Sequence, residues 1–232
     1  MVIVLTYDHP HRKTEDVVWR LMLAGRRPEL VVLKWENRKQ RRLLYAHRPA
    51  ETGWACESVT SPRGLAESLD LPIHFTNEID TLEDKLDRMS PEVVVIGGAG
   101  ILPPPVVEKH NVLNVHPGLL PARRGLDVFK WSVYDCKQVG VTAHLCDKRT
   151  DLGYRLIERE VPVFANDTLH NFAMRQYEYE LGTINPAIEM VLAGGGGEPV
   201  HPGETKPYKR MPRMMEAHLE RRFEDYKRVY AG

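Results

Sequence analysis

Residues 93–98, Val-Val-Val-Ile-Gly-Gly, decide the fold class of this chain. An apolar run that is rich in branched residues and ends in glycine is typical of a strand covered on both faces. A second run, residues 111–116, reads Asn-Val-Leu-Asn-Val-His and ends in Pro-Gly. Side chains alternate along a strand, so Asn114 and His116 are expected on one face, at the strand end where open α/β sheets place their ligands.

Strand and helix patterns alternate along the whole chain. The expected strands are residues 2–5, 30–33, 73–75, 93–98, 111–116, 139–145 and 154–163, and the expected helices are residues 14–24, 38–48, 62–69, 81–89, 127–137 and 168–192. This alternation predicts an α/β fold with a doubly wound, Rossmann-like, mostly parallel sheet and right-handed crossovers.

A glycine run after the last long helix divides the predicted domains. We expect residues 1–193 to form the catalytic domain and residues 194–232 to form a linker and a short, basic helical extension. An apolar stripe from Met215 to Tyr230 predicts that this helix packs on the body or on a second subunit, so a homodimer is one expectation. Contact with nucleic acid is the alternative for the basic tail.

Composition favours a soluble enzyme with no net charge that would attract charged polymers. Hydrophobic residues make up 42% of the 232 residues, and 32 basic side chains balance 32 acidic ones. No global field therefore attracts nucleic acid or an acidic membrane. The cysteines, Cys56, Cys136 and Cys146, lack zinc-type spacing, so reduced thiols, no metal and a cytoplasmic location are expected. No apolar run approaches the ~20 residues that cross a bilayer, and the N-terminus lacks a signal-peptide pattern.

An ordered set of motifs follows the first two strands discussed above. They are Asn114-x-His116-Pro-x-Leu-Leu-Pro121, Gly125, Val141-Thr-Ala-His144 and Asp151-x-Gly153. This set resembles the folate-dependent formyltransferases, a family that includes glycinamide ribonucleotide, methionyl-tRNA and sugar-amine enzymes. The resemblance covers residues 90–190. It implies the formyltransferase fold, with 10-formyltetrahydrofolate as cosubstrate.

The chemistry of formyl transfer needs the three residue types that the motifs supply. Transfer to an amine passes through a tetrahedral intermediate, and donors from an amide and a protonated histidine stabilise its oxyanion. A carboxylate raises the pKa of a nearby histidine and can relay the amine proton. The resemblance assigns these roles to Asn114, His116 and Asp151, so we expect Asp151 to raise the pKa of His116. His144 is predicted to be a structural hydrogen-bonding group.

The resemblance also implies that backbone groups of two loops hold the pterin ring of the folate. The implied residues are Gly98, Ala99, Gly100, Ile101 and Leu102 in the first loop, and Cys146 and Asp147 in the loop that ends at Asp151. Glycine would let the backbone approach a flat ring. A plain strand-ending turn is the alternative, and a dinucleotide site is excluded because no G-x-G-x-x-G opens a helix here.

The acceptor is predicted from what the sequence lacks. The segment after the first strand contains no glycine, unlike the phosphate loop of the glycinamide ribonucleotide enzymes, although Arg12 and Lys13 there could meet an anion. Arg124 matches the family arginine before Gly125 and is expected to hold a phosphate or carboxylate, whereas Arg123 replaces the usual aromatic residue. By elimination, the acceptor is a small metabolite amine, such as a nucleotide-linked amino sugar.

Two other functions remain open from the sequence. The same three residues with water as the acceptor would make a 10-formyltetrahydrofolate hydrolase. A non-catalytic folate-binding module is disfavoured because Asn114, His116 and Asp151 are all present.

Overall fold

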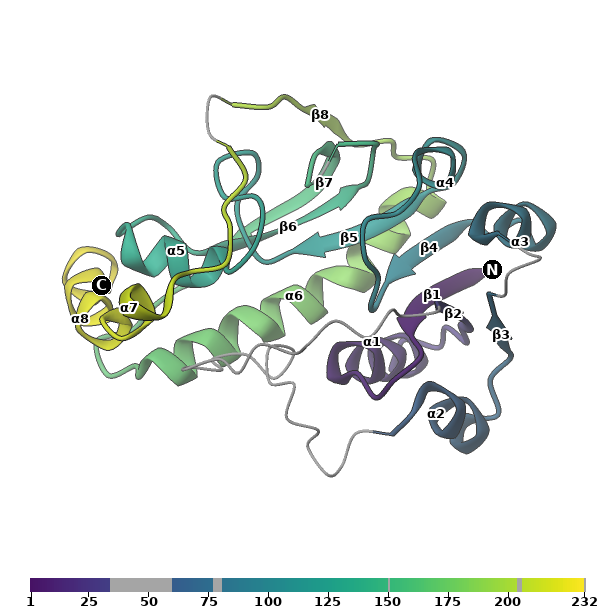
Figure 1. Ribbon diagram of the computed structural model, residues 1–232, viewed down its shortest axis with the longest axis horizontal. Coiled ribbons are helices and arrows are strands. Elements are labelled where there is room, and N and C mark those ends of the chain that lie inside the picture. The colour runs from purple at the N-terminus through teal and green to yellow at the C-terminus, as the bar shows by residue number, and fades with distance from the viewer. Residues whose placement is uncertain (34–59, 77–80, 150, 204–205, 232) are drawn as a thin grey trace.

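A computed structural model describes residues 1–33, 60–76, 81–149, 151–203 and 206–231. Its strands form one sheet in the order β3-β2-β1-β4-β5-β6-β7-β8 (Figure 1). The strands are β1 (Val2–Tyr7), β2 (Glu29–Leu33), β3 (Ile73–Phe75), β4 (Val93–Ile96), β5 (Val112–His116), β6 (Gly140–Leu145), β7 (Gly153–Glu160) and β8 (Glu198–Val200). The helices are α1 (Arg12–Leu23), α2 (Pro62–Leu69), α3 (Leu82–Met89), α4 (Pro104–Lys109), α5 (Val128–Tyr134), α6 (Leu169–Leu192), α7 (Arg213–Glu216) and α8 (Leu219–Tyr230).

The sheet has a parallel half and an antiparallel half. Strands β3, β2, β1, β4 and β5 pair in parallel, whereas β6, β7 and β8 each pair antiparallel with the preceding strand. The chain winds outward from β1 in one direction and from β4 in the other, so the strand order reverses between them. These features confirm the predicted doubly wound α/β fold.

Helices cover both faces of the parallel half, as the apolar strands require. Val93 and Val95 pack in the hydrophobic cluster that contains residues of α1, α2 and α6. Val94 points the other way, into the cluster that contains residues of α3 and α4. All three valines are at most 2% exposed. Figure 1 shows the long helix α6 running along one face of the sheet.

The chain beyond residue 193 packs on the body. β8 extends the sheet beside β7. The predicted apolar stripe lies on α8, where Phe223 and Tyr226 are at most 1% exposed and pack with Phe129 of α5 and Phe172 of α6. The stripe therefore packs on the body of its own chain, which is one of the two predicted possibilities; the other was a second subunit.

Two elements differ from the sequence prediction. Helix α4 begins within a run of three prolines and was not among the expected helices; proline fits the first turn of a helix, where its missing N–H is not needed. Strand β8 contains Pro199 and only three residues, which suits an edge strand and gives little alternation to detect. The predicted helix 38–48 lies outside the described residues. In the ranges given above, no helix is long and apolar enough to cross a membrane.

Candidate active site

The predicted catalytic residues meet at the carboxyl end of β5. Asn114 and His116 share one face of this strand, and the antiparallel partner β6 places His144 opposite Asn114. Asp151 lies in the loop between β6 and β7, and its Oδ1 atom is 3.5 Å from Nδ1 of His116. Strand alternation and the β6–β7 loop thus bring all three predicted residues together.

His116 is buried, and burial favours the neutral form of its ring. Its Nε2–H donates to the carbonyl oxygen of Arg123 at 2.7 Å, so the neutral ring carries its lone pair on Nδ1, facing Asp151. Burial lowers the pKa of His116, and the opposing effect of the Asp151 carboxylate is smaller. Asp151 therefore acts in the expected direction and raises the pKa of His116, but the net shift is downward because a side chain only 3% exposed loses more hydration than one carboxylate restores.

Asp151 is held by the backbone of the loop that follows β5. Its Oδ2 atom accepts a hydrogen bond of 2.7 Å from the N–H of Gly125. Asp151 has φ +52° and Gly153 has φ +110°, so the chain turns tightly here. A methyl group at Gly153 would lie 2.0 Å from the carbonyl oxygen of Leu145, so this position needs glycine. The tight loop predicted from Asp-x-Gly is present.

His144 fixes the amide of Asn114. Nδ1–H of His144 donates to the carbonyl oxygen of Leu152 at 2.8 Å, which leaves Nε2 as an acceptor. Nδ2 of Asn114 donates to that Nε2 atom at 3.1 Å. Burial lowers the pKa of His144 to about 4, so the ring remains an acceptor at neutral pH. One N–H of Asn114 is committed in this way.

The turn after β5 is held by polar residues that the sequence analysis did not single out. The hydroxyl of Thr142 donates to the carbonyl oxygen of Gly118 at 2.7 Å and accepts from the N–H of Leu120. Gln176 of α6 donates to the carbonyl oxygen of Pro117 at 2.7 Å. Both side chains are fully buried. In the sequence, their only signal is a polar residue at a position where the strand or helix pattern predicts an apolar face.

The first predicted folate loop follows β4 at the point where the strand order reverses. The hydroxyl of Tyr7 donates to the carbonyl oxygen of Ala99, and a methyl group at Gly98 would lie 2.7 Å from the Tyr7 ring. Gly98 is therefore explained by packing against Tyr7. In the described chain, the peptide groups of Gly100, Ile101 and Leu102 make no hydrogen bond, and Ile101 is 90% exposed. This stretch of backbone is available to a ligand.

The second predicted folate loop lies on the same face of the sheet. Cys146 and Leu102 of the first loop pack against one hydrophobic cluster, which also contains Val112 of β5. Val112 shares its strand face with Asn114, so both loops flank the face that carries the catalytic residues. Burial raises the pKa of the Cys146 thiol to about 12, which makes it a poor nucleophile. The Asp147 carboxylate is paired with Arg149 at 2.5 Å.

The predicted acceptor-binding cations have partners within the chain. Arg12 pairs with Asp16 at 2.9 Å, and Lys13 pairs with the buried Glu180 at 2.6 Å. The peptide of Arg124 joins the same loop as Gly125, and its carbonyl oxygen accepts from the N–H of Tyr208. Among the described residues, no group of His, Cys, Asp and Glu side chains could hold a metal ion.

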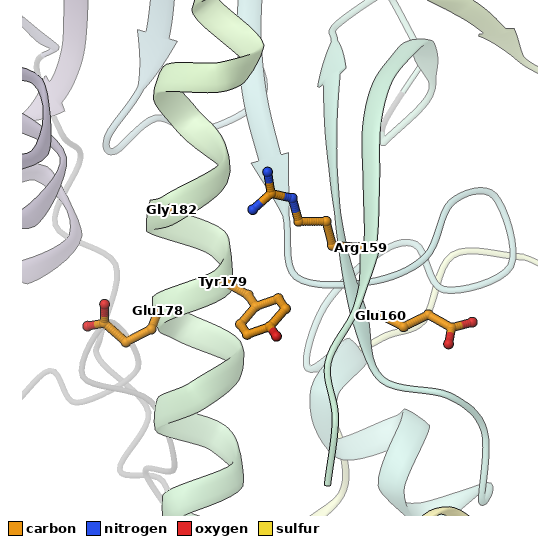
Figure 2. A pocket seen from close by; sticks show the side chains of 5 residues that line it. All are labelled: Arg159, Glu160, Glu178, Tyr179 and Gly182. Atoms are coloured by element: carbon orange, nitrogen blue, oxygen red, sulfur yellow. The ribbon is translucent and has the colours of Figure 1, made fainter. Parts of the chain in front are cut away.

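A pocket of about 640 Å³ lies elsewhere, between α6 and the distal end of β7. Figure 2 shows Tyr179 of α6 pointing toward the strands, with Arg159 and Glu160 on the neighbouring strand. Arg159 pairs with Val141 in the sheet, whereas Asp151 precedes the opposite end of β7. The pocket is therefore separate from the catalytic residues.

Comparison with known proteins agrees with this geometry. The family model described as formyl transferase matches residues 73–187. A methionyl-tRNA formyltransferase from Geobacter sulfurreducens is 28% identical over 138 residues, which cover 57% of this chain and 44% of that protein. The chain thus spans less than half of this relative. Residues 73–187 are thus similar to the formyl transferase family.

Two solved structures are similar over much of the chain. A sugar N-formyltransferase from Shewanella sp. FDAARGOS_354 has a TM-score of 0.59 and 16% identity, and covers 96% of this chain and 87% of that one; this likeness concerns the fold. The formyltransferase PseJ from Anoxybacillus kamchatkensis has a TM-score of 0.50 and 25% identity, and covers 63% of this chain and 80% of its own. It was solved with UDP-4,6-dideoxy-4-formamido-L-AltNAc and tetrahydrofolate.

Proposed function

We propose that this protein is an N-formyltransferase that moves the formyl group of 10-formyltetrahydrofolate to the primary amine of a small metabolite. The convergence of Asn114, His116 and Asp151 carries the proposal, because it joins an oxyanion donor to a proton relay. The match of residues 73–187 to the formyl transferase model and the open backbone at residues 100–102 support it.

The hydrogen bonds of His116 suggest the order of proton movements. Nε2–H is already used by the carbonyl oxygen of Arg123, so His116 can donate to an oxyanion only after Nδ1 gains a proton. The attacking amine, which becomes positively charged as its nitrogen bonds to the formyl carbon, supplies that proton through Asp151. The imidazolium formed at 3.5 Å from Asp151 is then stabilised by that carboxylate.

The remaining step returns the same proton. Asn114 and protonated His116 stabilise the oxyanion of the tetrahedral intermediate, an effect worth roughly 10²–10³ in rate for each donor. The bond between the formyl carbon and N10 of the folate then breaks, and N10 takes up the proton from His116. His116 and Asp151 finish in the protonation states in which they began, so no further reactant is needed.

The residues present fit a folate. The free peptide groups of Gly100, Ile101 and Leu102 would hold the edge of the ring, and the loop that begins at Cys146 would face it across the strand end. Tyr7 fixes the first loop through the carbonyl oxygen of Ala99, so these peptide groups are held in place before a ligand binds.

For the acceptor, we favour a nucleotide-linked amino sugar. The PseJ structure contains a UDP-linked formamido sugar. Arg124 directly precedes Gly125, whose N–H holds Asp151, so of the three predicted cations it lies on the same loop as the group that fixes the carboxylate and is the one we expect to meet a phosphate of the acceptor.

Turnover with defined amines tests this function. We would incubate the protein with 10-formyltetrahydrofolate and a panel of nucleotide-linked amino sugars, and measure tetrahydrofolate, formamide product and formate. A formylated sugar formed in step with tetrahydrofolate is the expected result. Formate without formamide would indicate the hydrolase. A protein that binds a folate analogue, as judged by thermal melting, but turns over no amine and no water would be the non-catalytic module.

A further inference from the structure

We propose that Tyr208 is a positioning residue for the catalytic pair His116 and Asp151. It lies in the strap, defined here as residues 206–211, which crosses the loop after β5. The inference rests on the proposed function for its catalytic meaning, but its structural content can be tested without turnover.

The loop that the strap crosses holds both catalytic side chains. The carbonyl oxygen of Arg123 fixes Nε2 of His116, and the N–H of Gly125 fixes Oδ2 of Asp151, each at 2.7 Å. A shift of the loop would therefore move the imidazole and the carboxylate relative to each other.

The backbone of Tyr208 brackets Gly125. Its N–H donates to the carbonyl oxygen of Arg124 at 2.8 Å, and its carbonyl oxygen accepts from the N–H of Leu126 at 2.9 Å. The approach is close, because a methyl group at Gly125 would lie 2.3 Å from the carbonyl oxygen of Tyr208. Gly125 also has φ +103°, a conformation that other residues rarely adopt.

The side chain of Tyr208 clamps the neighbouring Arg123. Its hydroxyl accepts from Nη1 of Arg123 at 2.5 Å and donates to Oδ2 of Asp135 at 3.1 Å, and Arg123 also pairs directly with Asp135 at 2.7 Å. The guanidinium lies over the Tyr208 ring, 5.2 Å from its centre. Arg123, which departs from the family pattern, is thus only 7% exposed and ties the strap to the catalytic loop.

Further contacts fix the strap to α5. Trp131 donates to the carbonyl oxygen of Lys209 at 2.7 Å, and the N–H of Met211 donates to Asp127 at 2.8 Å. Just beyond the strap, Lys130 and Glu216 form an ion pair of 3.2 Å in which both side chains are fully buried. These contacts hold the strap against α5 on the C-terminal side of Tyr208.

The test compares two hydroxyl deletions in the tail. Tyr208→Phe removes the clamp on Arg123. Tyr226→Phe, the matched control, removes a buried hydroxyl on α8 that accepts from the N–H of Val139, away from the catalytic loop. We would titrate His116 by NMR in each protein without substrates, and then measure kcat and KM.

Tyr208→Phe should raise the titration midpoint of His116. Burial lowers the pKa of this ring in the wild-type protein, and a loosened loop would let water reach it. It should also lower kcat on the order of 10-fold with little change in the KM of either substrate, since small misplacements of catalytic groups mainly affect the transition state. Tyr226→Phe should change neither quantity, although it loosens the tail. Asp151, Lys13 and Glu180, which also act on His116, are unchanged in both variants.

An unchanged His116 midpoint in Tyr208→Phe would overturn the proposal, as would an equal shift in both variants. Because the titration needs no substrate, it distinguishes failure of this inference from failure of the proposed function. If the wild-type protein turned over no amine, a shift confined to Tyr208→Phe would still establish the link between the strap and His116.

Discussion

The parallel and antiparallel halves of the sheet are built in different ways. In the parallel half, Val93, Val94 and Val95 alternate between two helix-covered faces, and neighbouring strands supply the same kind of residue. In the antiparallel half, the decisive contacts join distant segments, as when Gly125 holds Asp151 and Tyr208 clamps Arg123. The first half forms the edge at which the predicted catalytic residues lie, and contacts of the second half set the distance between His116 and Asp151.

The largest expected effect on turnover follows removal of a predicted catalytic group. Asp151→Asn and His116→Ala should each lower kcat by at least ~10², because the first loses the proton relay and the second an oxyanion donor. Steady-state turnover measures the effect. Asp87→Asn, the control, removes a carboxylate on α3 in the parallel half and should keep full activity. Wild-type-like rates in either catalytic variant would refute the assigned role.

Acid titration compares one histidine from each half, the half-buried His11 and the buried His144. Burial lowers the pKa of both His11 and His144 from 6.5 to about 4. The unfolded chain binds these protons as pH falls below 6.5, while the folded chain resists until about pH 4, so stability should fall across this window by up to about 3 kcal/mol per histidine. Denaturant unfolding from pH 7 to pH 4 measures the slope, and His11→Asn and His144→Asn should each flatten it. An unchanged slope in either variant would contradict the neutral state of that histidine.

Two glycine substitutions contrast the loop with the long helix. Gly125→Ala should lower the free energy of unfolding by about 2 kcal/mol, because φ is +103° and the added methyl group meets Tyr208. It should also reduce kcat, since its N–H holds Asp151. Gly182→Ala in α6 places the methyl group in open space and should stabilise the protein by about 0.5–1 kcal/mol. Chemical denaturation of both variants measures the difference, and equal effects would show that the strap does not restrict Gly125.

Loss of a binding cation should affect the acceptor alone. Arg124→Ala is expected to raise the KM of the acceptor on the order of 10-fold with kcat nearly constant, because a group that binds substrate and transition state equally alters only KM. Initial rates at varied acceptor concentration measure this. An unchanged KM would remove Arg124 from the acceptor site.

The smallest effect is expected in the parallel half. Thr81 caps α3, and its side chain and that of Asp84 each bond to the other residue's backbone N–H. Thr81→Ala should cost about 1 kcal/mol of stability without altering kcat or the His116 titration. Thermal and denaturant unfolding measure the loss. A change in the His116 midpoint would show that the two halves are coupled more tightly than the contacts indicate.

The contrast between local patterns and contacts that join distant segments explains what the sequence could predict. Helix Pro62–Leu69 and strand Ile73–Phe75 have the predicted bounds, because their signals are local. The juxtaposition of Asn114, His116 and Asp151 followed from motifs in order along the chain. The lowered pKa of His116 did not, since the burial that lowers it comes from packing rather than from neighbours in sequence. The role of Tyr208 was also hidden, because it is 85 residues from its partner Arg123.

The distance between Arg123 and Tyr208 has a consequence for biosynthesis. A ribosome makes the catalytic loop 85 residues before the side chain that clamps it. All five strands of the parallel half precede that loop in the chain, so they can begin to pair while the strap is still unmade. A nascent chain would therefore form the parallel half early, whereas the loop that fixes His116 and Asp151 would gain its contacts with Tyr208 only after the strap has been synthesised.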